Sequence, residues 1–256
     1  MPHTWDPERY LAYADERGRP FLDLVARIDA ESPRRVEDLG CGPGNLTGLL
    51  AQRWPGADVL GLDSSPEMIE RAQAPGVRFA VGDLREWVSD EPEQVDVLVS
   101  NATLQWVPDH LELLPRLVER VSPGGWFAFQ VPGNFDEPSH TIRRDLAAEE
   151  RYAGYTAGVA VPDSQDPATY LEVLAAAGCA VDAWETTYLH VLTGDDPVFT
   201  WVSGTGARPT LEALPPGLRE VFEEEFRGRL RAAYPRHDYG VLLPFRRVFV
   251  VARVAA

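Results

Sequence analysis

The sequence contains no lysine, and all 24 of its basic residues are arginine. Its 40 acidic residues outnumber them, which gives a formal net charge of −16 at pH 7. Nucleic-acid binding needs a continuous basic face, and scattered arginines in an acidic chain do not provide one. We therefore expect no nucleic-acid partner. Each arginine still offers a planar, permanently charged group that suits a carboxylate or a phosphate.

Long apolar segments and paired cysteines are scarce as well. No run approaches the roughly 20 apolar residues of a membrane span, and residues 1–13 lack the apolar core of a secretory signal. Cys41 and Cys179 lack the spacing of a disulfide framework or a metal site, and we expect Cys41 to be structural. These absences predict a cytoplasmic protein with no membrane partner and no metal.

The 256 residues, 45% of them hydrophobic, are enough for one α/β domain with a large core. Short apolar runs alternate with longer amphipathic stretches, which is typical of a mostly parallel sheet with crossover helices. We expect seven strands, at residues 34–40, 57–63, 77–83, 94–101, 124–132, 180–192 and 244–254.

The stretches between these strands have helical periodicity. We expect helices at residues 7–30, 45–54, 66–74, 109–121 and 166–179. Ser65 precedes Pro66, a pair typical of a helix N-cap and first helical residue. Residues 133–166 are predicted to be an irregular insertion with a short helix around 140–152, and residues 195–235 to be mostly helical.

A glycine-rich loop follows the first predicted strand in the sequence DLGCGPGN, from Asp38 to Asn45. Three glycines between a strand and a helix let a ligand approach the backbone and the free N–H groups of the helix. A dinucleotide fingerprint would require glycine where Asn45 stands, and a phosphate-binding P-loop would require lysine. The remaining pattern, an aspartate followed by Gly40, Gly42 and Gly44, resembles the first motif of class I S-adenosylmethionine-dependent methyltransferases. The alternative is a tight turn without a ligand.

Polar residues also end the next three predicted strands, at the edge where open α/β sheets bind ligands. Asp63, followed by Ser64, can accept hydrogen bonds from both ribose hydroxyls of a nucleoside. In the enzymes that the loop resembles, an acidic residue at the place of Asp83 binds the adenine amino group, and the next N–H, here of Leu84, meets the ring. Either aspartate alone could be an ordinary cap at a strand end.

Two further residues complete the predicted cofactor site. Met68 is placed to pack on the adenine face, and Asn101 closes the fourth strand beside the methionine part of the cofactor. The whole set of predicted cofactor-binding residues also includes Asp38, Asn45, Trp5 and Tyr10.

Outside the loop, the chain resembles the trans-aconitate methyltransferases over almost its whole length. The resemblance is carried by the segments WDPERYLAYADERGRPFLDLVARI (5–28), VSNATLQWVPDH (99–110), VPGNFDEPSH (131–140), WETTYLHVL (184–192), WVSGTGARPTLEAL (201–214), YP (234–235) and LPFRRVFVVAR (243–253). It implies one Rossmann-like domain over residues 1–256, with helices on both faces of the sheet and an antiparallel last strand. It also implies a helical lid at about 1–30 and helical substrate caps at about 133–166 and 194–243.

The resemblance implies that a carboxylate of a small polycarboxylic acid receives the methyl group of S-adenosylmethionine. A carboxylate is already an anionic nucleophile at neutral pH, so alignment and desolvation suffice and no catalytic base is expected. The acid does require positive partners. The predicted substrate-binding residues are Arg247, Arg208, Arg19, Arg17 and Trp106. The alternative for each arginine is an exposed ion pair.

Arg246 and Arg247 stand side by side in the last predicted strand. Successive residues of a strand point to opposite faces, so both cannot enter one pocket. We expect Arg247 to bind the acid and Arg246 to be ion-paired at a rim or under a helix. His140 and His190 are expected to be structural.

Three other functions stay open at this point. A methyltransferase for a malonyl thioester would share the carboxylate chemistry but needs a basic surface for its carrier, which we do not find. A protein that binds S-adenosylmethionine without turnover would keep the same motifs. A nicotinamide-dependent dehydrogenase is disfavoured by Asn45.

Overall fold

The computed structural model describes residues 14–89 and 94–256 of the chain. Its strands are β1 (Arg35–Leu39), β2 (Asp58–Asp63), β3 (Val77–Val81), β4 (Val95–Asn101), β5 (Val121–Pro132), β6 (Cys179–Leu192), β7 (Arg236–His237) and β8 (Gly240–Val254). Along the sheet the order is β3-β2-β1-β4-β5-β8-β6, and the two-residue β7 pairs with β8. The first five strands are parallel, whereas β8 is antiparallel to both β5 and β6. The predicted Rossmann-like sheet with an antiparallel last strand is confirmed.

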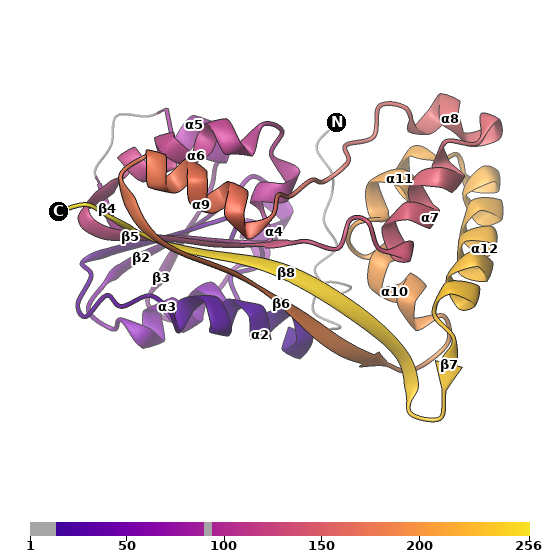
Figure 1. Ribbon diagram of the computed structural model, residues 1–256, viewed down its shortest axis with the longest axis horizontal. Helices are drawn as coiled ribbons and strands as arrows, with labels where there is room; N and C mark the ends of the chain where they lie inside the picture. The colour runs from indigo at the N-terminus through magenta and orange to yellow at the C-terminus, as the bar shows by residue number, and fades with distance from the viewer. Residues whose placement is uncertain (1–13, 90–93) are drawn as a thin grey trace.

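Helices cover both faces of the sheet (Figure 1). On one face lie α2 (Ala14–Val25) and α3 (Thr47–Arg53), and on the other α5 (Leu84–Trp87), α6 (His110–Glu119) and α9 (Pro167–Ala176). The short α4 (Pro66–Arg71) follows β2. As predicted, Ser65 caps it, because the Ser65 hydroxyl accepts a hydrogen bond from the Met68 N–H.

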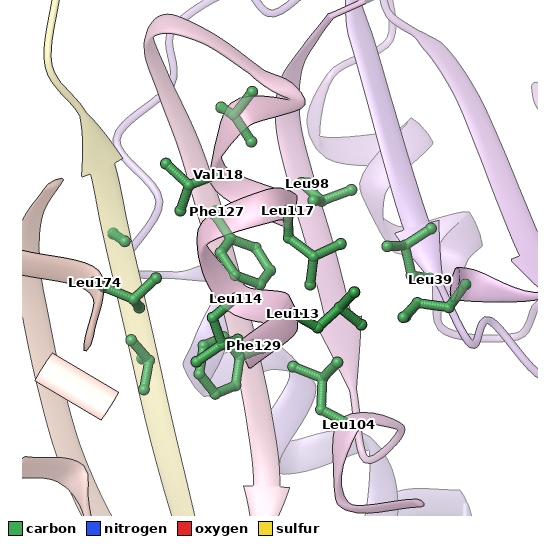
Figure 2. Close-up of a cluster of buried hydrophobic side chains, with 14 of the residues drawn as sticks. Leu39, Leu98, Leu104, Leu113, Leu114, Leu117, Val118, Phe127, Phe129 and Leu174 are labelled. Carbon is green, nitrogen blue, oxygen red and sulfur yellow. The ribbon is translucent and has the colours of Figure 1, made fainter. Parts of the chain in front are cut away.

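The central strands are buried on both sides, and alternate residues serve different cores. In β5, Phe127 and Phe129 pack with the leucines of α6, such as Leu117, and all three are fully buried (Figure 2). Ala128, between the two phenylalanines, belongs to the opposite core with Phe21 of α2. Each such leucine or phenylalanine contributes roughly 1.5–3 kcal/mol through burial.

Five further helices form a layer beyond one end of the sheet, which we call the helical layer (Figure 1). It consists of α7 (Pro138–Ala147), α8 (Glu150–Thr156), α10 (Pro197–Ser203), α11 (Arg208–Ala213) and α12 (Pro216–Ala233). The layer has its own apolar core, in which Phe222 and Phe226 are fully buried. The single short helix expected around residues 140–152 is wrong, because two helices occupy this stretch and α8 begins after Glu149 at an extended N-cap.

Strands β6 and β8 stay paired with each other and extend past the parallel strands toward the helical layer (Figure 1). The first half of β8 therefore packs in the core of that layer, as Leu243 and Phe245 show, while its second half pairs with β5. Pro132 and Arg247 are the last partners in the β5–β8 register. Arg247 thus lies at the junction of the sheet and the helical layer.

Candidate active site

A cavity of about 460 Å³ lies between the carboxyl ends of the parallel strands and the helical layer. Its wall includes residues from the loops after β1, β2, β3 and β4, together with residues of α7, α10 and β8. Ten of the predicted site residues line it: Gly40, Gly42, Asp63, Ser64, Met68, Asp83, Leu84, Asn101, Trp106 and Arg247. Residues far apart in the sequence therefore meet around one cavity.

The glycine loop needs glycine for two different reasons. Gly40, Gly42 and Gly44 all have positive φ, at 79°, 56° and 79°, a conformation that costs other residues free energy. A Cβ on Gly40 would lie 2.0 Å from the Thr103 hydroxyl oxygen, and one on Gly44 would lie 2.4 Å from Phe79 Cζ. A Cβ on Gly42 would meet nothing within 4 Å. Gly42 is thus the glycine that presents bare backbone to open space in the cavity.

Asp63, at the end of β2, holds the loop in place. Its Oδ2 accepts a hydrogen bond from the Gly42 N–H at 2.8 Å, and its Oδ1 accepts one from the Ser65 N–H at 2.9 Å. Burial raises the pKa of this carboxyl group, while the two backbone hydrogen bonds act in the opposite direction. Each carboxylate oxygen can accept a second hydrogen bond, so the geometry leaves room for the two hydroxyls of a ribose.

The loop after β3 gives a similar arrangement. Asp83 is the N-cap of α5, because its Oδ1 accepts a hydrogen bond from the Arg85 N–H at 2.7 Å. Asp83 is therefore a cap, which was the alternative that the sequence left open, and it also lines the cavity. Met68 and Leu84 form an apolar wall nearby and are almost fully buried. Together these residues suit a flat, apolar base with a polar edge.

Asn101 ends β4 and lines the cavity. Its side-chain oxygen Oδ1 is buried and accepts no hydrogen bond from the described residues. The next residue, Ala102, has a positive φ of 54° and donates its N–H to the Gln130 carbonyl at 2.8 Å. Non-glycine residues in this conformation are strained and often stand at functional sites.

Three predicted cofactor residues, Asp38, Gly44 and Asn45, are not part of the cavity wall. Asp38 is buried behind the loop, where its Oδ2 accepts a hydrogen bond from the Thr47 hydroxyl at 2.7 Å. Burial raises its pKa to about 7. Cys41 is also buried, and its thiol pKa is raised by burial and by nearby carboxylates, which fits a structural residue and not a nucleophile.

At the other end of the cavity Arg247 is 5% exposed. Its Nη1 donates to the side-chain oxygen of Gln130 at 2.9 Å, and its guanidinium carbon lies 4.5 Å from the centre of the Phe245 ring. Gln130 is neutral and fully buried. These contacts fix the guanidinium group in the wall of the cavity.

Arg246 points to the other side of β8, as the alternation of a strand requires. Its guanidinium group contacts Glu185 at 2.5 Å and Asp166 at 2.6 Å, and it donates to the Gly133 carbonyl at 3.1 Å. The expected ion pairing of Arg246 is confirmed.

Two of the other predicted arginines, Arg208 and Arg19, do not line the cavity. Arg208, the first residue of α11, forms an ion pair with Glu212 at 2.6 Å. Arg19 is exposed on α2 and lies over the Tyr188 ring at 5.1 Å. Arg17 belongs to the described backbone of α2, but its side chain lies outside the described part. Among the three predicted arginines whose side chains the structure describes, Arg247 is the one that lines the cavity.

Of the three predicted aromatic site residues, the structure describes Trp106. Trp106 ends a short 3-10 helix, Leu104–Trp106, after β4 and lines the cavity. Trp5 and Tyr10 lie outside the described residues.

Several wall residues were not predicted from the sequence. Asn134, His140 and Gln105 are polar and at most 8% exposed, and they line the cavity beside the aromatic residues Trp201 and Phe245. His140, which we expected to be structural, also lines the cavity. The sequence offered one signal for Asn134, its position just after the end of β5, the strand next to β4.

Within the described residues no group of three potential metal ligands comes together. None of the described helices combines the length and apolar character that crossing a membrane requires.

The cavity residues fit S-adenosylmethionine. The exposed backbone at Gly42 and the acceptors of Asp63, Asp83 and Asn101 match a nucleoside with an amino-acid tail. The fold and this edge of the sheet therefore define a class I methyltransferase.

Comparisons with known proteins agree with this class and narrow it. The sequence model of a family described as "Methyltransferase domain" matches residues 10–183. The trans-aconitate 2-methyltransferase of Rhodococcus jostii is 54% identical over 254 residues, which cover 98% of this chain and 99% of that protein. The chain belongs to the trans-aconitate 2-methyltransferase family.

Solved structures support the fold. The YcgJ protein of Bacillus subtilis has a TM-score of 0.59 at 13% identity, covering 93% of this chain and 99% of that chain. Phosphoethanolamine N-methyltransferase 2 of Haemonchus contortus, solved with S-adenosylmethionine, has a TM-score of 0.53 at 17% identity, covering 93% of this chain and 53% of that chain.

Proposed function

We propose that the protein transfers the methyl group of S-adenosylmethionine to one carboxylate of trans-aconitate, giving a monomethyl ester and S-adenosylhomocysteine. The main support is that the hydrogen-bond acceptors at the strand ends, which suit a nucleoside, and the buried Arg247 line one and the same cavity. Membership in the trans-aconitate 2-methyltransferase family supports the choice of acid.

The chain's residues act by holding and aligning the reactants. Bound S-adenosylmethionine supplies an electrophilic methyl group on a positively charged sulfur. Arg247 binds a carboxylate of the acid through its planar fork, and the surrounding Trp106, Trp201 and Phe245 keep water away. With the cofactor bound, a carboxylate oxygen of the acid would take up the methyl group, and the electron pair of the broken C–S bond would stay on the sulfur of S-adenosylhomocysteine. No proton moves, so no general base is required.

The helical layer is the proposed substrate cap. Its helices α7 and α10 contribute His140 and Trp201 to the cavity wall, and we assign residues 133–166 and 194–243 to this role. Residues 1–30 are the proposed lid over the cofactor, and the whole chain is proposed to act as one domain. A cytoplasmic location and the absence of a nucleic-acid partner belong to the proposal, supported by the net charge of −16 and the free cysteines.

A substrate panel tests the proposal. Purified protein is incubated with S-adenosylmethionine and trans-aconitate, related di- and tricarboxylic acids, or a malonyl thioester, and kcat/KM is measured for each. We expect the highest value for trans-aconitate. A higher value for the malonyl thioester would overturn the assignment of the acid, and binding of S-adenosylmethionine without turnover of any acid would overturn the methyltransferase activity.

A further inference from the structure

The acid end of the cavity has too few charged groups for a tricarboxylate. Among the described wall residues only Arg85 and Arg247 are positively charged. Arg85 belongs to the nucleoside end, because its backbone N–H donates to Asp83 Oδ1 at 2.7 Å, and its guanidinium group donates to the Pro108 carbonyl at 2.6 Å. One guanidinium group can bind one carboxylate in a bidentate manner. The other carboxylates of the acid therefore need neutral hydrogen-bonding partners.

Asn134 has the properties of such a partner. It is 2% exposed and lines the cavity, yet neither its side-chain oxygen nor its side-chain nitrogen has a hydrogen-bond partner among the described residues. Its backbone is fixed, since the Asn134 carbonyl accepts from the Glu137 N–H at 3.1 Å and the preceding Gly133 donates to the Arg246 carbonyl at 2.9 Å. A buried amide with both ends unsatisfied is costly, and a ligand carboxylate would satisfy its N–H group.

His140 lies in the first turn of α7, a short distance along the chain, and lines the same cavity. It is 8% exposed, and its Nδ1 has no hydrogen-bond partner in the described part of the chain. The Phe135 ring packs on it edge-on, with the ring centres 5.1 Å apart, and Gly206 lies close to it, since a Cβ there would be 2.9 Å from His140 Cε1. The ring is thus held in a fixed position with an unused nitrogen.

His140 is neutral at physiological pH. Burial, together with the charges of Arg143 and Arg144, lowers its pKa to about 4. A neutral imidazole carries one N–H donor, so it can hold a carboxylate oxygen without adding charge.

We propose that Asn134 and His140 are specificity-determining residues that donate hydrogen bonds to a carboxylate of the acid, other than the one bound by Arg247. This inference rests on the proposed function. It places Arg247, at the junction of β5 and β8, and the neutral pair, on the segment from β5 into α7, around one substrate. An acid that lacks the carboxylate held by the neutral pair should gain nothing from Asn134.

The test compares Asn134→Ala, Asn134→Asp and His140→Phe with the wild-type protein, using trans-aconitate and S-adenosylmethionine as the two varied substrates. Removing hydrogen bonds to a charged group should raise KM for the acid about 10- to 100-fold in Asn134→Ala and about 10-fold in His140→Phe. Asn134→Asp keeps the shape but adds a negative charge, so the increase should be larger still. KM for S-adenosylmethionine should stay within about twofold, because the nucleoside end is untouched.

Matched controls are Gln52→Ala and His237→Ala, two exposed residues that do not line the cavity. A second readout uses three analogues of trans-aconitate, each with a different one of its carboxylates replaced by a methyl group, measured as substrates or as competitive inhibitors. Asn134→Ala should leave the affinity for one of them nearly unchanged, which a merely structural role would not do.

The outcomes separate the two proposals. If the wild-type protein methylates trans-aconitate but Asn134→Ala changes its KM less than twofold, or weakens S-adenosylmethionine equally, the inference is wrong and the proposed function stands. If the wild-type protein methylates no polycarboxylic acid, both are wrong.

Discussion

At the residue scale, the two neighbouring arginines of β8 have different surroundings. Arg247 is buried in the cavity wall against the neutral Gln130, whereas Arg246 is held by Glu185 and Asp166 on the other side of the strand. Strand alternation separates them, and this much could be derived from the sequence. Which acidic residues pair with Arg246 could not, because those partners come from β6 and the start of α9.

Arg247→Ala should raise KM for trans-aconitate about 100-fold, because a charge-assisted bidentate contact is lost. KM for S-adenosylmethionine should change little, since the proposed cofactor residues lie on the loops after β1, β2 and β3, away from β8. Arg246→Ala is the matched control and should change KM for the acid less than about threefold. Steady-state kinetics, with each substrate varied in turn, measures these KM values. An equal rise in KM for the acid in both variants would refute the assigned roles.

The raised pKa of Asp38 predicts how the free energy of unfolding depends on pH. Its folded pKa of about 7 exceeds the ordinary 3.8, so the folded protein keeps a proton that the unfolded chain loses. Stability from this group is therefore present below pH 3.8 and lost as the pH rises toward 7. Between pH 5 and pH 8 the loss amounts to about 3 kcal/mol.

Asp38→Asn should remove this part of the pH dependence. Urea unfolding at pH 5 and pH 8 measures the free energy of unfolding, and the difference between the two values should shift by about 3 kcal/mol in favour of pH 8. Asp145→Asn, an exposed carboxyl on α7, should leave the difference as in the wild type. The same pH dependence in wild type and Asp38→Asn would show that Asp38 is ionised in the fold.

At the scale of elements, the glycine loop and the helical layer mark what local patterns can and cannot predict. The loop after β1 was predictable, because glycine spacing reflects backbone conformation directly. The boundary between α7 and α8 was not, since it depends on how both helices pack on the rest of the layer. The start of β8 at Gly240, close to its pairing with β7 and β6, was not predicted either. Pro244 lacks a backbone N–H, so the sequence pattern favoured a later start for this strand.

Two glycines of the loop should respond differently to alanine. Gly44→Ala should lower the free energy of unfolding by about 2–4 kcal/mol, from the positive φ and the approach to Phe79. Gly42→Ala should cost only about 1 kcal/mol, because its Cβ meets open space. That Cβ would enter the cofactor's space, however, so affinity for S-adenosylmethionine should fall about tenfold or more. Denaturant unfolding and titration calorimetry measure the two effects, and the reverse order would contradict this account of the loop.

At the scale of the whole molecule, the sequence predicted the fold and the strand-end residues of the cavity wall better than the wall residues that come from the segment after β5 and from the helical layer. Strands, crossover helices and strand-end residues such as Asp63 follow from local patterns and the resemblance to one family. Asn134 and His140 carry no motif, and they enter the wall only because β5 and α7 lead the chain past β8. Arg208, by contrast, stands in a family-like segment, yet it is paired with Glu212 on its own helix and does not line the cavity.

The central claim is that this cavity carries methyl transfer to a carboxylate, and one measurement tests it most directly. Purified protein is incubated with trans-aconitate and S-adenosylmethionine that carries a labelled methyl group, and the products are separated and identified by mass spectrometry. We predict a labelled monomethyl ester of trans-aconitate, cleaved by mild base, together with an equal amount of unlabelled S-adenosylhomocysteine. Label recovered on carbon or nitrogen, or no labelled acid at all, would contradict the account.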